Sequence, residues 1–180
     1  MRDYAVKQAD RSVLARMIAA HARPALTPKD VSPVAERGFV RALRHASLPF
    51  DGLGLEVTEV KLATAQALGT CLDSLPPHGL LALLEDGQGR RGLMALSNGL
   101  VDALIEVQTT GHVEQTALPP RAVTRIDEAL TRDYSDLFLS AMARETEEVE
   151  GRDWPHRMAF GSTLADRDRL TLLMPEQDHV

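Results

Sequence analysis

The sequence predicts an α/β (α+β) fold in which helices pack on a mostly antiparallel sheet. Three observations point to this class: a long amphipathic helix from about residue 124, a β-hairpin signal over 79–96, and an internal echo. The echo is the order strand, short helix, proline, which occurs over 53–77 and again over 157–175. It indicates internal repetition. Because the chain reaches Val180 before a second hairpin, either the second copy is truncated or the repeat is degenerate.

Composition predicts one main domain. The 180 residues, 44% of them hydrophobic, suffice for a globular core, and we expect an N-terminal helix and linker over 1–32 before the domain at 33–180. The net charge of −6 argues against nucleic-acid binding, which needs a basic face for the phosphates. Cys71 is the only cysteine, which fits a reducing cytoplasm. No stretch approaches the ~20 apolar residues of a membrane span.

The chain opens with a predicted amphipathic helix over 3–22, which Pro24 and Pro28 end. Its basic residues lie away from the apolar side: Arg2, Lys7, Arg11, Arg16 and Arg23. Its large aliphatic residues fall on one side: Val6, Val13, Leu14, Met17 and Ile18. Two interpretations remain open, a solvated terminus or a helix that docks on this domain or on a partner.

A second helix is predicted from Pro33, with Ser32 as its N-cap. Its apolar face consists of Phe39, Val40, Leu43 and Ala46. Another face carries three arginines at helical spacing, Arg37, Arg41 and Arg44. Such a row is usually a solvated face, and the alternative is a binding patch.

The predicted sheet comes mainly from the next forty or so residues. Residues 53–61 alternate apolar and polar side chains, which is typical of a half-buried strand. A short helix follows over 64–74. The apolar run 79–85 and the return strand 90–96 flank Asp86-Gly87, a dipeptide that allows positive φ in a hairpin turn.

A helix over 97–107 is expected to lead into a polar loop formed by Thr109, Thr110, Gly111 and His112. The long helix begins after Thr124, whose hydroxyl can cap it, and Asp127 is placed to reach back to a free N–H. It runs to about Glu147. Its predicted apolar stripe is Ile126, Leu130, Tyr134, Leu137, Phe138, Ala141 and Met142. A strand over 154–160 and a helix over 164–174 complete the chain.

The order of these motifs resembles the middle domain of the flagellar motor switch protein (the FliM family), which is related to the CheC-type chemotaxis phosphatases. The resemblance rests on Gly92-Leu93-Met94-Ala95-Leu96, Leu100-Val101-Asp102-Ala103-Leu104-Ile105, a glycine-containing loop, and Arg121-x-x-Thr124-x-x-Asp127-Glu128. It covers roughly residues 33–180. The resemblance implies a CheC-like fold with two related halves around a pseudo-twofold axis. It also implies a non-enzymatic subunit of the flagellar C-ring, acting in rotor assembly, torque transmission and rotational switching.

The resemblance also implies partners of the FliG and FliN type, self-association in a ring, and a cytoplasmic location peripheral to the inner membrane at the flagellar basal body. The family's FliG-contacting loop carries Gly-Gly-x-Gly, which matches Thr109 to His112 here through Gly111 alone. A bulky residue at Gly111 is expected to weaken FliG capture with little loss of thermal stability. Arg37, Arg41 and Arg44 are candidates for lateral contact. CheY binding is not expected, because residues 1–23 do not match the family's CheY-binding peptide.

The enzymatic alternative is a CheC-type phosphatase acting on phosphorylated CheY. That family uses Ser or Asp, a Glu four residues on, and an Asn three residues later. Thr124 and Glu128 fit, but Thr131 replaces the Asn, and in the earlier helix Ser32 and Glu36 are followed by Phe39. Neither replacement can hold the attacking water as a carboxamide does. We therefore expect no enzymatic activity and no cofactor.

No metal site is expected either, since no two of the 6 histidines lie three to five residues apart. A type III secretion ring protein or a stand-alone adaptor remains a further alternative to a flagellar role.

Overall fold

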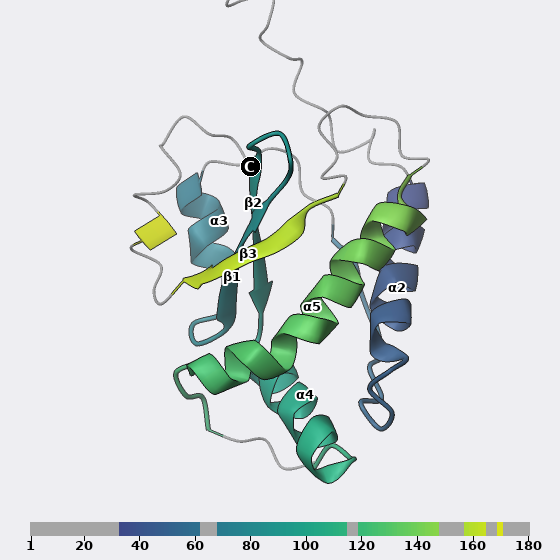
Figure 1. The fold of residues 1–180 in the computed structure, drawn as a ribbon, viewed down its shortest axis with the longest axis vertical. Helices are drawn as coiled ribbons and strands as arrows, with labels where there is room; N and C mark the ends of the chain where they lie inside the picture. Colours follow the sequence, from purple (N-terminus) through teal and green to yellow (C-terminus); the bar gives the residue numbers. More distant parts are fainter. Residues whose placement is uncertain (1–32, 62–67, 115–118, 148–156, 165–168, 171–180) are drawn as a thin grey trace, which may run out of the picture.

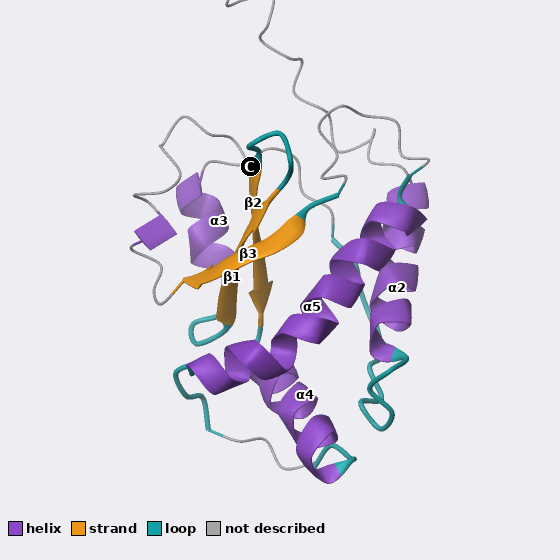
Figure 2. Cartoon of the chain, viewed as in Figure 1, coloured by secondary structure: helices purple, strands orange, loops and turns teal. Residues whose placement is uncertain are grey.

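The computed structural model describes residues 33–61, 68–114, 119–147, 157–164 and 169–170. Its elements are, in order, α2 (Pro33–Ser47), α3 (Leu68–Ser74), β1 (Leu80–Glu85), β2 (Arg91–Leu96), α4 (Asn98–Thr110), α5 (Arg125–Glu145) and β3 (Ala159–Leu164) (Figures 1 and 2). The strands form a three-stranded sheet in the order β2-β1-β3, with both pairings antiparallel. The predicted class, helices on an antiparallel sheet, is confirmed at this level. The predicted N-terminal helix over 3–22 and linker lie outside the described residues.

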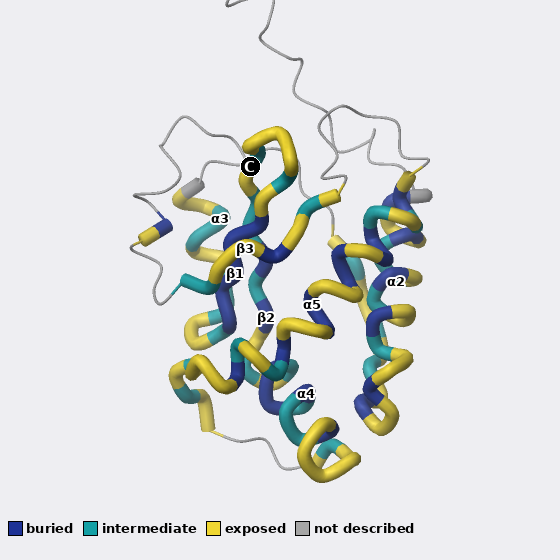
Figure 3. Tube along the Cα trace, in the orientation of Figure 1, coloured by how far each residue is buried: buried dark blue, intermediate teal, exposed yellow. Residues whose placement is uncertain are grey.

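The central strand β1 is buried on both faces, because helices cover each side of the sheet (Figure 3). One face, with Leu80, Ala82 and Leu84, belongs to the main core, together with side chains of α2, α4 and α5. The other face meets a smaller cluster in which Leu81 packs with Leu72 of α3. A strand that is covered on both faces has a continuous run of apolar residues in its sequence, as residues 80–84 do.

The β1–β2 hairpin is confirmed, with Leu80 opposite Leu96 and Glu85 opposite Arg91. Its turn differs from the expected one. The residue with positive φ is Gly89, at 78°, and not Asp86 or Gly87. Gly89 N–H donates to the Asp86 carbonyl at 3.3 Å, and Asp86 N–H to the Arg90 carbonyl at 3.1 Å. This is a longer turn that closes through a left-handed glycine.

Helices α2 and α5 pack side by side, and α5 also contacts β3 of the sheet (Figure 1). Phe39 meets Phe138 edge to face, with ring centroids 5.3 Å apart. Phe50, just beyond α2, meets Tyr134 in the same way at 5.6 Å. A Cβ on Gly38 would lie 2.8 Å from the Glu145 carbonyl oxygen, so glycine permits the close approach of the two backbones.

The predicted stripe of α5 is partly wrong. Ile126 and Leu137 are 71% and 40% exposed, whereas Asp127, Thr131 and Ser135 are buried. The face of α5 that points to the core is therefore rotated about the helix axis relative to the face that the apolar pattern predicts. Thr131 and Ser135 tolerate burial because their hydroxyls donate to the carbonyls of Asp127 and Thr131, at 2.8 and 3.0 Å.

The predicted strand over 53–61 is absent. Leu53 is buried, Leu55 and Val57 are half-buried and their neighbours are exposed, so the alternation is real. The segment nevertheless pairs with no described strand. Alternation reports which side faces the core, but a strand also needs a partner for its backbone groups.

Of the predicted strand over 154–160, residues 154–156 lie outside the described residues, and β3 begins at Ala159 and ends at Leu164. Most of the predicted 164–174 helix lies outside the described residues. Because 53–61 forms no strand, the first copy of the expected repeat is incomplete, and no repeat is identified in the described part of the chain.

Candidate functional site

The predicted contact residues lie at the C-terminal end of α4, and the structure corrects their local conformation. Thr109 and Thr110 belong to the last turn of the helix and not to a loop. Their hydroxyls donate to the carbonyls of Ile105 and Glu106, each at 2.8 Å, which supports the extra turn. Gly111 then ends the helix at φ 81°, with its N–H donating to the Val107 carbonyl at 3.0 Å.

This helix end is exposed but locally fixed. Thr109, Thr110, Gly111 and His112 are all exposed. His112 Nδ1 lies 3.2 Å from the Thr110 carbonyl oxygen. Beyond the turn, Glu114 N–H donates to the Glu106 carboxylate at 2.9 Å, which ties the outgoing chain back to the helix. The four predicted residues are therefore brought together on one ordered, solvent-facing corner.

The corner rests on the loop that follows α2. A Cβ on Gly52 would lie 2.7 Å from the Gly111 carbonyl oxygen, so the two backbones touch. Gly52 also has a positive φ of 90°, which favours glycine. Gly52 thus permits the loop after α2 to lie directly against the backbone at the end of α4.

An open groove of about 730 Å³ borders the same corner. It lies between the loop after α2, the last turns of α4 and the outer face of α5. Its floor and rim include Phe50, Val107 and Leu137, and the carboxylates of Asp51, Asp133 and Asp136. Among the described residues, no lysine or arginine lines it. The sequence does not reveal this groove, because its lining is drawn from three separate segments.

The three arginines of the row on α2 are exposed to solvent, as expected for a solvated face. Arg37, Arg41 and Arg44 line a second, shallow groove with residues 57–60 of the extended segment. Arg41 Nη1 lies 3.8 Å from Glu145 Oε2, and the Arg41 side chain is 63% exposed. This groove shares no described lining residue with the acidic groove, and none of the residues 109–112 lines it.

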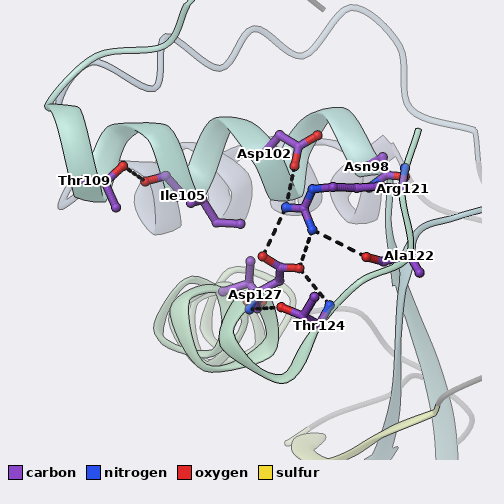
Figure 4. A network of polar contacts seen from close by, with 9 residues as sticks. Asn98, Asp102, Ile105, Thr109, Arg121, Ala122, Thr124 and Asp127 are labelled. Carbon is purple, nitrogen blue, oxygen red and sulfur yellow. Dashed lines mark hydrogen bonds and ion pairs between the residues drawn. The ribbon is translucent and has the colours of Figure 1, made fainter. Parts of the chain in front are cut away.

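A buried ionic network fixes α4 relative to α5, and sequence patterns did not reveal it. Arg121, in the segment before α5, points between the two helices (Figure 4). Its guanidinium donates to Asp127 at 2.6 and 3.1 Å and to Asp102 of α4 at 2.8 Å. Asp127 and Asp102 are only 6% and 8% exposed. Two buried carboxylates need a cation nearby, but their burial is known only from the structure.

The network shifts the pKa values of Asp127 and Arg121. The hydrogen bond from Arg121 lowers the pKa of Asp127 from 3.8 to about 2, helped by hydrogen bonds from Thr124. The same hydrogen bond raises the pKa of Arg121. Thr124 N–H donates to Asp127 Oδ2 at 2.7 Å, and Asp127 N–H donates to Thr124 Oγ1 at 3.3 Å, so the expected cap is a complete capping box.

The phosphatase-like pattern on α5 is poorly placed for chemistry. Thr124 caps the helix, and Glu128 accepts a hydrogen bond from Thr163 of β3 at 2.5 Å. Thr131, at the position of the family's water-orienting Asn, is 0% exposed. It therefore faces the core and not a surface where a phosphorylated partner could dock. In the other pattern Ser32 lies outside the described residues.

Neither the comparison with protein-family models nor that with curated proteins finds a match for this chain. Within the described ranges, no group of three or more His, Cys, Asp or Glu residues could hold a metal ion. None of the helices in that part of the chain is both long enough and apolar enough to cross a membrane.

Proposed function

We propose that this chain is a non-enzymatic subunit of a FliM-type rotor ring, with a CheC-like fold that acts through protein contacts. The corner formed by Thr109 to His112 would contact a torque-transmitting partner of the FliG type. The arginine row of α2 would serve lateral contacts with neighbouring copies or with a FliN-type partner. The subunit would then work in the cytoplasm at the basal body.

The observation that carries this proposal is the exposed, ordered end of α4. Hydrogen bonds fix each residue from Thr109 to His112 before any partner arrives. A surface that is already ordered loses less conformational entropy on binding, which favours its use in recognition. The Arg121 network holds α4 and α5 in one orientation, so force applied to this corner would pass into the body of the domain.

Two assays test the proposal against its alternatives. Capture of the full chain by an immobilised FliG-type protein is expected, and its absence would favour an adaptor without a motor role. The decay of phosphorylated CheY should proceed at its intrinsic rate in the presence of the chain. Acceleration of that decay would contradict the non-enzymatic assignment.

A further inference from the structure

The segment 55–61 is strand-like in its side-chain pattern, but no described strand lies beside it. Leu55 and Val57 are half-buried, whereas Glu56 and Thr58 between and after them are exposed. Among the described residues, none forms a hydrogen bond with the backbone of this segment. An extended backbone with free N–H and C=O groups is a template for pairing with another strand.

An open groove of about 430 Å³ lies between this segment and α2. Val40 of α2 lines it together with Val57 and Val60 of the segment, and all three valines are half-buried. Each valine keeps apolar surface in contact with water, and covering that surface is favourable. Because one wall of the groove is the segment itself, a chain lying in the groove would meet both these apolar side chains and the backbone groups of 57–60.

The α2 side of this groove carries an excess of positive charge. It is lined by one acidic residue, Glu36, and by the three arginines Arg37, Arg41 and Arg44. In the described part of the chain Arg37 and Arg44 form no ion pair, and Arg41 Nη1 lies 3.8 Å from Glu145 Oε2. The groove therefore suits a strand in which apolar residues alternate with carboxylates.

The segment that lines the groove has this composition itself. It reads Leu55-Glu56-Val57-Thr58-Glu59-Val60. Glu56 is exposed and forms no ion pair within the described ranges, whereas Glu59 pairs with Lys61 at 2.8 Å. Two copies related by a two-fold axis would place these segments antiparallel, and each copy would offer Glu56 to the arginines of the other. Since the net charge of the chain is −6, two copies repel in general, and this pairing brings opposite charges together.

We propose that the free chain forms a two-fold dimer in which residues 55–60 of two copies pair as antiparallel strands along their α2 grooves. Glu56 of each copy then lies against Arg37 and Arg44 of the other. This dimer does not depend on the ring function, because a two-fold contact closes with two copies, whereas a ring needs head-to-tail contacts. The same arginines cannot serve both contacts at once. Failure of FliG capture would leave the dimer unaffected, and loss of the dimer would leave FliG capture at 109–112 unaffected.

Sedimentation velocity of the full chain tests the charge pairing. The wild type should change from monomer to dimer over micromolar concentrations, as expected for a small interface. Arg37→Glu/Arg44→Glu and Glu56→Arg should each raise the dissociation constant at least about tenfold. The overall charge alone would make Glu56→Arg associate more tightly, so a weaker dimer reports the specific contact. Asp73→Arg makes the same change on α3, at the other face of the sheet, and should not weaken the dimer.

The two sets of changes are then combined. The triple variant Arg37→Glu/Arg44→Glu/Glu56→Arg exchanges the charges of both sides of the contact and should dimerise as the wild type does. In the wild type, hydrogen–deuterium exchange of amides 55–60 should slow at alternate positions as dimers form. A wild type that stays monomeric up to millimolar concentration, a triple variant that stays monomeric, or a dimer in which all of these amides remain unprotected would overturn the proposal.

Discussion

The guanidinium of Arg121 binds the carboxylate of Asp127 through two hydrogen bonds, of 2.6 and 3.1 Å, in a geometry that only arginine provides. The same group reaches Asp102 at 2.8 Å. One side chain outside any helix thus pairs with two buried carboxylates on different helices. The orientation of the first turn of α5, and with it the exposure of Ile126, follows from this pairing.

Removing Arg121 should therefore destabilise the fold. Arg121→Met leaves two buried carboxylates without a cation, and we expect a loss of about 2–3 kcal/mol in the free energy of unfolding, since the arginine is itself 39% exposed. Arg121→Lys should lose about half as much, because it keeps the charge but not the paired hydrogen bonds. Urea unfolding measures both. Arg125→Met, at an exposed position nearby, is the control and should change stability by less than about 0.5 kcal/mol.

Stability should also depend on pH through Asp127. Its pKa in the folded state is about 2, below the unfolded value of 3.8, so the unfolded state binds the proton first as pH falls. The contribution is complete above about pH 4 and is lost between pH 4 and pH 2. We expect it to be about 1–2 kcal/mol after allowance for solvent near Arg121. Unfolding curves of the wild type and Asp127→Asn, compared across this range, should converge toward low pH. A constant difference would show that this ionic pair does not titrate as described.

The contact between Gly52 and Gly111 makes another prediction. Gly52→Ala adds a Cβ 2.7 Å from the Gly111 carbonyl oxygen, so backbone must move, and we expect a loss of about 3 kcal/mol. Gly54→Ala is the matched control. Its φ of 58° is also left-handed, but nothing lies within 4 Å of the new Cβ, so only about 1 kcal/mol should be lost. Thermal unfolding of both variants separates crowding from backbone strain, and equal losses would mean that the two loops do not touch.

The expectation that a bulky residue at Gly111 would spare stability needs revision. Gly111 has a φ of 81° and ends α4, so most side chains there would cost about 1 kcal/mol. Gly111→Asn should cost less than Gly111→Val, since Asn tolerates the left-handed region. Differential scanning calorimetry of the two variants measures this order. A Val variant as stable as the wild type would contradict the cap.

Local signals in the sequence predicted much of this fold. The hairpin, α2, and the capping box of α5 each depend on residues close in sequence, and each was found. The strand at 53–61 was not found, because a strand depends on a distant partner that alternation does not report. Ile126 and Leu137 were wrongly placed on the buried face of α5. That face instead carries Asp127, which pairs with Arg121, and two residues whose hydroxyls bond to carbonyls of the same helix, Thr131 and Ser135.

The candidate site was predicted only in part. The assignment of Thr109 to His112 as a partner contact stays a prediction. Their helical turn was missed because it depends on threonine hydroxyls that bond back to the helix, in a sequence that also suits a loop. The acidic groove and the Arg121 network join residues from separate elements, so no spacing along the chain could reveal them.

The affinity of the full chain for a FliG-type protein tests the central claim most directly. His112→Glu introduces a negative charge at the exposed corner and changes no core residue. It should raise the dissociation constant about tenfold. His78→Glu makes the same change at an exposed position before β1 and should leave the constant unaltered. Equal affinities for wild type and His112→Glu, or no measurable binding at all, would contradict the assignment of this corner as the partner contact.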